Sequence, residues 1–416
     1  MCIENSESKA ARKILISIVS GQIIPNLLPV NELNPEFCLL VASNKMGKKA
    51  EQIRAAFINA GFDKEKIIIV RQVDEYKITD IAEKTKTALL EIKEKYFNNG
   101  EEPEYIFNFT GGTKHMSIGL YEMAFKDFEG KNVKLFYSLT PDKKNNIVKY
   151  QMFSPGEDIK EYVYSKNIFI GLYLNALSSI DIKDSSPLKS AEETAKLYKN
   201  REKIVNHSFI RALREIYNGS FKKEHKNEFK TIKRRFCINN EEHIKILNIP
   251  QSNNFTAEEI REYFKEWEFI PKERDIISKE EVDYLTGGWL EEYVYNSIPV
   301  KEEYKVLSAV IQNDPNDEND KNEYDVLVMY NNIFYIIECK TIFGRDLAES
   351  TAFKSSALRQ KFGNEDCAYI VFPHLAAADR QKVEQYFRNK GEKEKVKVCT
   401  PEELLTNIFS NKEEQR

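Results

Sequence analysis

Residues 323–340 read EYDVLVMYNNIFYIIECK, and this stretch predicts a β-hairpin. Both halves are dense in β-branched and aromatic residues, which favour strands. The two asparagines at 331–332 stand between the halves, and asparagine tolerates the positive φ that a two-residue turn requires. A turn at these asparagines places Asp325 directly opposite Glu338 on one face of the sheet. The stretch therefore predicts a sheet that brings two carboxylates together.

The two carboxylates would meet in apolar surroundings, because hydrophobic side chains fill both faces of the predicted hairpin. Like charges about 4.5–5.5 Å apart repel and lose hydration unless a positive group lies between them. A divalent cation with oxygen ligands fits that place. Lys340 lies two residues beyond Glu338 on the same face, opposite Glu323. The pattern indicates a metal-dependent phosphodiesterase centre, and the alternative is a surface hairpin whose acids face water.

Bulk properties narrow the class of protein. A chain of 416 residues exceeds the usual size of one core, so two or three domains are expected. The formal net charge is −4, so any nucleic-acid surface must be local. The 6 cysteines are scattered without a CxxC pair, which argues against a zinc site and a secreted disulfide framework. No apolar run has the length of a membrane span, and a cytoplasmic protein is expected.

Residues 12 to about 180 alternate strand-like and helical segments. This alternation predicts a mostly parallel, Rossmann-like sheet with helices on both faces. The expected strands cover 13–20, 37–43, 67–70, 105–109 and 133–139, and the expected helices cover 45–60, 80–97 and 114–128. A strand at 147–153 is expected to return antiparallel, whereas the apolar stretch 162–174 fits no element of the pattern.

A second constellation is the sequence TGGTK at 110–114, between an expected strand and an expected helix. Its glycines let backbone N–H groups approach a ligand, and a helix N-terminus favours an anion. Ligands of open α/β sheets bind beyond the carboxyl ends of the strands, where further polar residues follow two other strands. The candidate ligand-binding residues are Ser20, Gln22, Ser43, Thr110, Gly111, Gly112, Thr113 and Lys114. The alternative is a plain strand-to-helix turn; the motif is neither a dinucleotide fingerprint nor a Walker loop.

The rest of the chain divides into a helical module and a second α/β region. Between Asn200 and Arg235 stand eleven lysines and arginines against four acids, a basic face suited to nucleic acid or simply to solvent. A capping box of Thr256 with Glu259 marks one of the expected helices. The later region is expected to hold helices at 287–295 and 347–361, strands at 304–312, 368–372 and 396–399, an acidic loop at 314–322 and a last helix. The expected domains are 1–183, 184–277 and 278–416.

In their order along the chain, these motifs resemble those of the CARF–nuclease effectors of type III CRISPR defence. TGGTK after the fourth strand resembles the CARF domain, and GGWLEEY at 287–293 with the hairpin's E-x-D and E-C-K resembles a PD-(D/E)xK nuclease. The resemblance implies an α/β multidomain protein: a Rossmann-like CARF domain, a central helical or winged-helix-like module, and a restriction-endonuclease-like domain.

The resemblance also implies an activity. CARF domains dimerise and bind a cyclic oligoadenylate, most often cyclic tetra-adenylate, and the nuclease domains of the homodimer then cut single-stranded DNA, RNA or plasmid DNA with Mn²⁺ or Mg²⁺. The TGGTK turn would contact the ligand. Asp325, Glu338 and the carbonyl of Cys339 would hold the metal, which activates water. Lys340 would position the nucleophile and stabilise the transition state. Glu291, which shares a helix face with apolar residues, is expected to be the accessory acid.

Several alternatives stay open at this point. The chain also fits a ligand-sensing nucleic-acid-binding regulator with an inactive nuclease domain, or a repair or restriction nuclease without a messenger. The sequence decides neither DNA against RNA nor the ring size of the activator. It leaves open whether the CARF domain degrades its ligand, and Glu292 is the alternative to Glu291.

Overall fold

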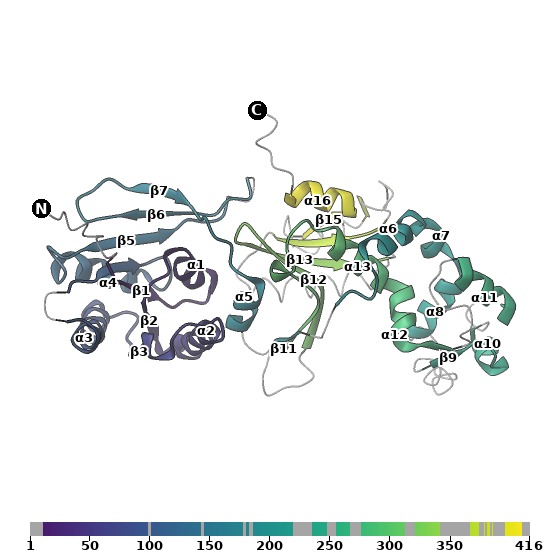
Figure 1. Cartoon of the computed structure of the whole chain (residues 1–416), viewed down its shortest axis with the longest axis horizontal. Helices are drawn as coiled ribbons and strands as arrows, with labels where there is room; N and C mark the ends of the chain where they lie inside the picture. The colour runs from purple at the N-terminus through teal and green to yellow at the C-terminus, as the bar shows by residue number, and fades with distance from the viewer. Residues whose placement is uncertain are drawn as a thin grey trace, which may run out of the picture.

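Three parts follow one another along the long axis of the molecule in the computed structural model (Figure 1). A sheet with helices on both faces lies at one end, a second sheet lies in the middle, and a helical module lies at the other end. The structure describes residues 11–98, 101–142, 145–177, 180–182, 186–218, 235–247, 255–266, 276–312, 321–341, 367–373, 378, 381–382, 385 and 396–409.

The N-terminal sheet has the strand order β3-β2-β1-β4-β5-β6-β7. Its first five strands in this order are parallel, and β6 and β7 continue it antiparallel. The strands are β1 (Lys13–Ile18), β2 (Phe37–Ser43), β3 (Ile67–Val73), β4 (Glu104–Asn108), β5 (Val133–Ser138), β6 (Lys149–Phe153) and β7 (Lys160–Val163). All residues of β2 are buried, as expected for a central parallel strand covered on both faces. The Rossmann-like sheet predicted from the strand–helix alternation is confirmed.

Helices cover both faces of this sheet. On one face α1 and α2 contribute Leu27 and Ile53 to the core, and on the other α3 and α4 contribute Ile81 and Leu120. The helices are α1 (Ile24–Leu33), α2 (Gly47–Asn59), α3 (Ile78–Tyr96) and α4 (Lys114–Lys126). The sequence pattern missed α1 because it contains two prolines; Pro25 sits in the first turn, where a helix does not need the missing N–H. Two short 3₁₀ turns, η1 (Asn44–Met46) and η2 (Lys64–Lys66), adjoin β2 and β3.

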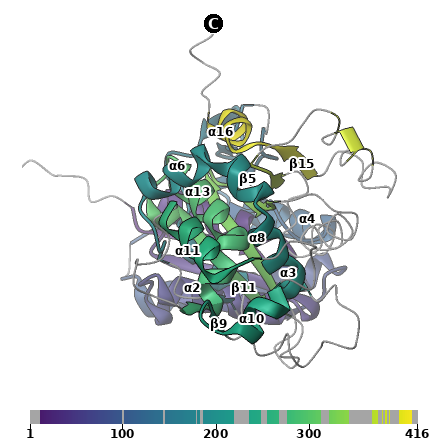
Figure 2. The same ribbon diagram turned by 90° about the vertical axis from the view of Figure 1, so that its right-hand side faces the viewer.

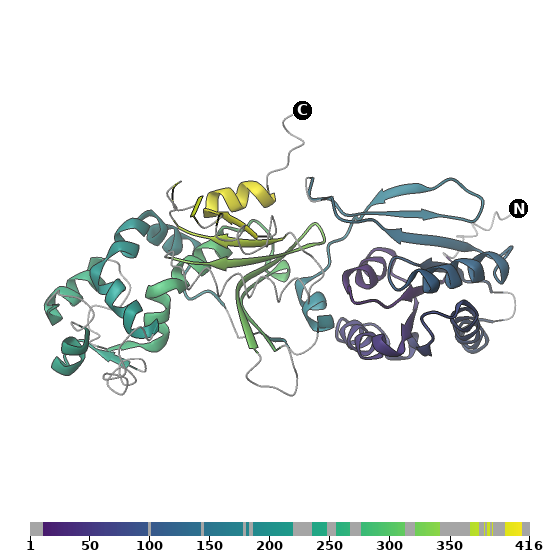
Figure 3. The same cartoon turned by 180° about the vertical axis from the view of Figure 1, so that it is seen from behind.

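The unplaced stretch 162–174 ends β7 and enters helix α5 (Ile170–Leu177), which packs against α2. Tyr173 of α5 is fully buried, and its ring lies 4.7 Å from that of Phe334 in the middle sheet. The apolar core therefore continues from the N-terminal domain into the middle one, and Figure 3 shows the short helix α5 between the two sheets.

The middle sheet has the order β15-β14-β13-β12-β11-β8. Its members are β8 (Ile180–Ile182), β11 (Lys305–Gln312), β12 (Lys321–Tyr330), β13 (Ile333–Cys339), β14 (Ala368–Val371) and β15 (Val396–Cys399). β13, β14 and β15 run parallel, and the other pairs are antiparallel. β8 precedes residue 183 yet pairs with β11, so one strand crosses the predicted domain limit.

Around this sheet lie a last helix, α16 (Pro401–Phe409), and the helix α13 (Trp289–Ser297), which follows a π-helical turn, η4 (Tyr284–Gly288). A 3₁₀ turn, η5 (Glu302–Tyr304), leads into β11. The predicted strands and helix of this region are confirmed where the structure describes them. The expected helix at 347–361 lies outside the described residues, as does most of the expected acidic loop at 314–322.

The central module is mainly helical, as expected. Its elements are α6 (Ala191–Lys199), α7 (Arg201–Asn206), α8 (Ser208–Asn218), β9 (Arg235–Cys237), α10 (Glu241–Leu247), α11 (Ala257–Glu266), β10 (Ile276–Ser278) and α12 (Lys279–Asp283). The predicted capping box of α11 is confirmed, since Glu259 N donates to Thr256 Oγ1 at 3.2 Å and Thr256 N donates to Glu259 Oε2 at 2.9 Å. Figure 2 shows this module from its free end. Among the described helices, none combines the length and apolarity that crossing a membrane requires.

Candidate active site and ligand cradle

The β12–β13 hairpin has the predicted register. Val326 pairs with Ile337 and Tyr330 pairs with Ile333, which leaves Asn331 and Asn332 as the two turn residues. Their φ angles are 48° and 61°, the left-handed values that a two-residue hairpin turn needs. Asp325 and Glu338 therefore follow the Val326–Ile337 pair at the far end of the hairpin from the turn.

Lys340 lies between the two hairpin acids. Its Nζ donates to Asp325 Oδ2 at 3.2 Å and to Glu338 Oε2 at 3.1 Å. Asp325 Oδ2 also accepts from the backbone N–H of Cys339 at 2.7 Å. Both acids are buried. Burial opposes the charge on Lys340, but the two carboxylates and their hydrogen bonds outweigh it and raise the pKa of the ammonium group.

Helix α13 adds a third carboxylate. Burial, and next the charge of Asp325, raise the pKa of Glu291 well above its ordinary value. Glu292 points elsewhere: its carboxylate accepts from Tyr284 Oη at 2.8 Å and from the backbone N–H of Leu188 and Lys189. The structure thus brings Glu291 to the hairpin acids and uses Glu292 to hold the segment that enters α6.

The donor set fits a hard divalent cation in chemical terms. Glu291, Asp325 and Glu338 offer oxygen ligands, and Lys340 supplies a single positive charge against three carboxylates. Among the described residues, no three His, Cys, Asp or Glu side chains already surround one point as a metal site would. The ammonium group of Lys340 instead bridges Asp325 and Glu338.

The predicted ligand-binding residues Ser20, Gln22, Ser43 and 110–114 form a group that we call the cradle. It lies at the carboxyl ends of β1, β2 and β4, where the strand order reverses between β1 and β4. A Cβ on Gly111 would lie 3.0 Å from Ser20 Oγ, so these two residues touch. Gly112 has φ +80°, and a Cβ there would overlap the Cγ2 methyl of Ile18. Only glycine fits this second position.

Thr113 caps α4 and fixes the neighbouring loop. Its Oγ1 accepts from Met116 N at 3.2 Å and donates to the carbonyl of Glu75 at 2.7 Å. Lys114 is exposed and makes no hydrogen bond or ion pair within the described part of the chain, so its charge is available to a ligand. Ser20 Oγ donates to the carbonyl of the exposed Gln22 at 3.2 Å.

The sequence patterns missed the loop after β3. Glu75 forms an ion pair with Lys45 at 2.6 Å and lies beside the buried Ser43, one of the predicted ligand residues. Tyr76, which is 64% exposed, places its ring 5.9 Å from that of His115 on α4. The loop carries no glycine-rich signature that would have identified it. It brings an exposed aromatic ring to the rim of the cradle.

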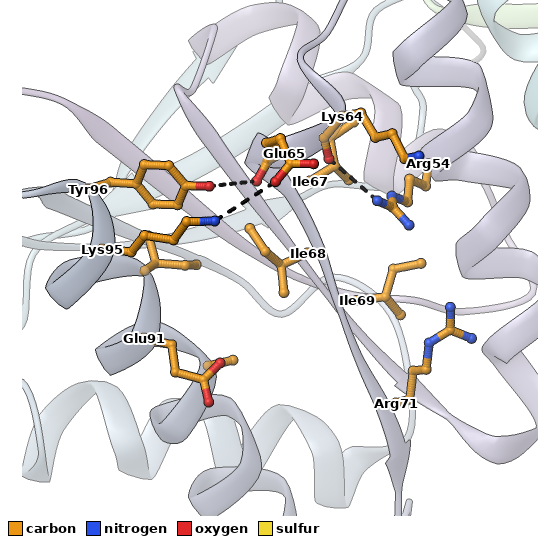
Figure 4. Close-up of a pocket in the computed structure, with 12 residues that line it drawn as sticks. Arg54, Lys64, Glu65, Ile67, Ile68, Ile69, Arg71, Glu91, Lys95 and Tyr96 are labelled. Atoms are coloured by element: carbon orange, nitrogen blue, oxygen red, sulfur yellow. Dashed lines mark hydrogen bonds and ion pairs between the residues drawn. The ribbon is translucent and has the colours of Figure 1, made fainter.

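A groove of about 340 Å³ lies elsewhere on this domain, along the edge strand β3 (Figure 4). Arg54 and Lys64 line one side, and Lys95 and Tyr96 of α3 line the other. The groove follows the first half of β3, whereas the cradle lies beyond the strand ends. It contains none of the predicted ligand residues.

Comparisons with known families agree with this geometry. The Card1 CARF domain family matches residues 14–166, and the Card1-like endonuclease domain family matches residues 278–404. This chain joins a Card1 CARF domain to a Card1-like endonuclease domain. The resemblance inferred from TGGTK and the carboxylate hairpin is thereby confirmed.

Two solved structures share the fold of the CARF–endonuclease chain over nearly its whole length. VC1899 from Vibrio cholerae matches with a TM-score of 0.61 and 16% identity over 95% of this chain and 96% of its own. Can2 from Sulfobacillus thermosulfidooxidans, solved in complex with cyclic tetra-adenylate, matches with a TM-score of 0.61 and 17% identity over 96% of this chain and 98% of its own. No curated protein matches the sequence.

The turn of the β12–β13 hairpin docks on the CARF domain. Asn332 is buried, its Nδ2 donates to the carbonyl of Lys166 at 2.9 Å, and its Oδ1 accepts from Ile168 N at 2.7 Å. Asn331 Nδ2 donates to the carbonyl of Asn146 at 3.1 Å, and Tyr335 Oη bonds Asn146 Oδ1 at 3.1 Å. One end of the hairpin carries the acids, and the other end is fixed to the CARF domain.

Hydrogen bonds also join this docking segment to the cradle. Thr110 Oγ1 accepts from the backbone N–H of Ser138 at 2.8 Å. Ser138 Oγ lies 2.5 Å from Tyr164 Oη within the domain core. Tyr164 begins the segment whose residues Lys166 and Ile168 hold the hairpin turn. A partly buried path of hydrogen bonds and backbone therefore runs from the cradle to the hairpin.

Proposed function

We propose that this protein is a CRISPR-associated ancillary nuclease that a cyclic oligoadenylate, with cyclic tetra-adenylate as the first choice, activates by binding to its CARF domain. It acts as a homodimer in the cytoplasm and hydrolyses phosphodiester bonds of DNA or RNA without sequence specificity. Mn²⁺ or Mg²⁺ is its cofactor. The observation that carries the proposal is the hairpin, whose acidic end forms the reaction centre and whose turn is bonded to the CARF domain.

The reaction centre uses four side chains. Asp325, Glu338 and Glu291, with the carbonyl of Cys339, would hold the divalent ion. When bound, that ion lowers the pKa of water and neutralises charge on the phosphate. Lys340 keeps its proton because its two carboxylate neighbours raise its pKa, so it remains a cation that orients and stabilises the phosphate.

The CARF cradle suits a ligand with repeated phosphates and adenines. Gly111 and Gly112 expose backbone N–H groups, and the N-terminus of α4 with Lys114 favours negative charge. The hydroxyl of Ser20 lies at the same strand ends, while those of the buried Ser43 and of Thr113 hold the loop of Glu75 beside them. Cyclic tetra-adenylate, with which the similar Can2 protein was solved, has this chemistry.

The coupling between the two sites follows the bonded path described above. A ligand at the cradle contacts the strand end that includes Thr110, whose hydroxyl fixes the backbone of Ser138. Tyr164 and the segment after it pass a displacement to Asn332 and so to the hairpin that carries the acids. Because the hairpin is bonded to the CARF domain and carries the acids of the nuclease domain, ligand binding in one domain can be coupled to the position of the acids in the other.

The test is a cleavage assay on labelled single-stranded DNA, single-stranded RNA and plasmid DNA. Each substrate is incubated with Mn²⁺ or Mg²⁺ and with cyclic tri-, tetra- or hexa-adenylate in turn. We expect cleavage that requires both a cation and one of the rings, with cyclic tetra-adenylate most effective. Asp325→Asn should abolish it, whereas Asp158→Asn, a change at an exposed acid beyond β6, should not.

The assay separates the alternatives. Strong cleavage without any cyclic oligoadenylate contradicts the activation and favours a repair or restriction nuclease. Tight ligand-dependent binding of nucleic acid, with no cleavage under any condition, favours the regulator with an inactive nuclease domain.

A further inference from the structure

One arginine of the central module is buried against the endonuclease domain. Arg214 lies on α8, in the basic stretch at 200–235, and is 6% exposed. Arg211, one turn earlier on the same helix, is exposed. A basic face that only met solvent or nucleic acid would leave both side chains outside, so Arg214 has a different role.

The guanidinium group of Arg214 makes three hydrogen bonds. Nε donates to the carbonyl of Thr286 at 3.0 Å, and Nη2 donates to Thr341 Oγ1 at 2.9 Å. Nη1 donates to the carbonyl of Val205 at 3.4 Å. Thr341 Oγ1 in turn donates to the carbonyl of Thr286 at 2.9 Å. Arg214, Thr286 and Thr341 therefore close a small ring of hydrogen bonds, which we call the arginine ring.

The arginine ring joins the two elements that carry the reaction centre. Thr286 lies in η4, the turn that leads directly into the helix of Glu291. Thr341 is the residue after Lys340 and follows the end of β13. Helix α13 also packs directly on β12 and β13, and the arginine ring adds hydrogen bonds between the turn before that helix and the residue after β13. We infer that Arg214 is a positioning residue of the nuclease: through the arginine ring it sets the position of Glu291 relative to Lys340.

The chemistry of the residue supports a geometric role. None of the carboxylates in the described part of the chain pairs with Arg214, and its acceptors are two carbonyls and a hydroxyl. Burial lowers the pKa of its guanidinium to about 10. Burying a cation without a counter-charge costs several kcal/mol, and an apolar side chain would pack there without that cost. What arginine alone supplies is a planar fork that can reach several fixed acceptors at once.

A small displacement at this place is enough to affect the rate. Misplacing reacting groups by about 1 Å costs on the order of 100-fold in rate. Without Arg214, the bond from Thr341 Oγ1 to the carbonyl of Thr286 is the one hydrogen bond left between η4 and the strand end among the described residues. The central module, of which neither family match covers the part before residue 278, would then be part of the nuclease.

The experiment uses the full chain and rests on the nuclease activity proposed above. The variants are Arg214→Met, Arg214→Lys, Thr341→Val and the double change Arg214→Met/Thr341→Val, with Arg211→Met as the matched control on the exposed side of the same helix. For each, kcat and KM are measured at saturating cation and cyclic tetra-adenylate on the substrate that the unmodified protein cuts best.

We expect Arg214→Met to lower kcat about 10- to 100-fold with KM within about twofold, and Arg214→Lys to recover part of the loss. Arg211→Met should change neither constant. The double variant should have the same kcat as Arg214→Met, because both substitutions disrupt the same ring of hydrogen bonds. A kcat for Arg214→Met above half the original, or effects that multiply in the double variant, would overturn the inference. A general loss of stability would instead lower the amount of folded enzyme in every assay.

A second measurement keeps the test independent of activity. Hydrogen–deuterium exchange of residues 284–297 should speed up at least tenfold in Arg214→Met relative to Arg211→Met, with no change in the CARF strands. Unchanged exchange of residues 284–297 would overturn the role of the arginine ring, whether or not the protein cuts any substrate. A failure to cut any of the substrates would by itself contradict only the proposed function. If Arg214→Met fails to fold, Thr341→Val, which removes one hydroxyl, is subject to the same two criteria.

Discussion

Replacing Asn332 by glycine should uncouple the two ends of the molecule. Glycine keeps the φ of 61° at no steric cost, so the turn itself survives. The change removes a buried hydrogen bond from Ile168 N–H at 2.7 Å and a partly buried one to the carbonyl of Lys166 at 2.9 Å. It leaves the N–H of Ile168 and the carbonyl of Lys166 without these partners. The unsatisfied N–H of the buried Ile168 costs about 1–3 kcal/mol, and the lost bond to Lys166, an exposed residue, about 0.5–1.5 kcal/mol, so the interface should lose about 2–4 kcal/mol.

This loss sets the size of the expected effect. Each 1.4 kcal/mol corresponds to about a tenfold change in an equilibrium, and allosteric couplings are typically about 1–3 kcal/mol. We therefore expect the ratio of cleavage rates with and without cyclic tetra-adenylate to fall at least tenfold in Asn332→Gly. Asn332→Asp, which keeps the acceptor for Ile168 N–H, should fall in between.

The assay measures activation and ligand affinity on the same preparation. Asn331→Gly is the matched control, because it alters the same turn but removes a single, partly buried hydrogen bond at 3.1 Å. Calorimetric titration of the ligand reports whether the cradle is intact. Activation of Asn332→Gly within twofold of the original, together with a lowered melting temperature, would refute the coupling and leave the turn a purely structural contact.

Three further changes test other parts of the structure. Gly112→Ala drives a Cβ into an Ile18 methyl and should weaken cyclic tetra-adenylate binding at least tenfold by calorimetry, whereas Gly130→Ala, also at positive φ but with open space, should not. Glu292→Gln should cost about 1–3 kcal/mol of unfolding free energy in urea titrations and leave kcat unchanged, because its carboxylate accepts two backbone N–H groups and a phenol away from the reaction centre. The side-chain hydrogen bond from Arg12 lowers the pKa of Glu36 to about 2 from 4.5, so its stabilisation is present above pH 4.5 and is lost as the pH falls towards 2. Glu36→Gln should therefore cost about 1–3 kcal/mol at pH 7 after allowance for solvent screening, and the difference should shrink below pH 4.5; a constant difference would contradict the assignment.

The sequence predicted those parts of the structure that local rules determine. Strand–helix alternation gave the CARF sheet, and the two asparagines fixed the hairpin register from which the meeting of Asp325 and Glu338 follows. The helical period separated Glu291 from Glu292. Each of these depends on residues that are close in sequence or share one periodic element.

What the sequence did not predict depends on contacts between distant segments. Arg214 looked like one charge in a basic stretch, and only its packing against η4 and Thr341 shows that it is buried. Asn332 was predicted as a turn residue for its φ, but its second role, holding the CARF domain, requires a partner 164 positions away. No local pattern carries such information, because the side chain is the same in either role.

The hairpin thereby acquires two constraints that act on opposite ends. Its turn is held by the CARF domain through Asn332, and the residue after Lys340 is held by the central module through Arg214. When its turn is displaced, a rigid hairpin held at both ends can move its acidic end as well. Alternatively, the contacts at the acidic end can hold that end in place. Which of these happens depends on whether the arginine ring stays closed while the turn moves. If the ring stays closed, η4 and the central module move with the hairpin and the reaction centre keeps its shape; if it opens, ligand binding at the cradle shifts the hairpin acids against Glu291. Exchange rates of residues 284–297 measured with and without cyclic tetra-adenylate distinguish the two, because only an opening ring would expose the amides of η4.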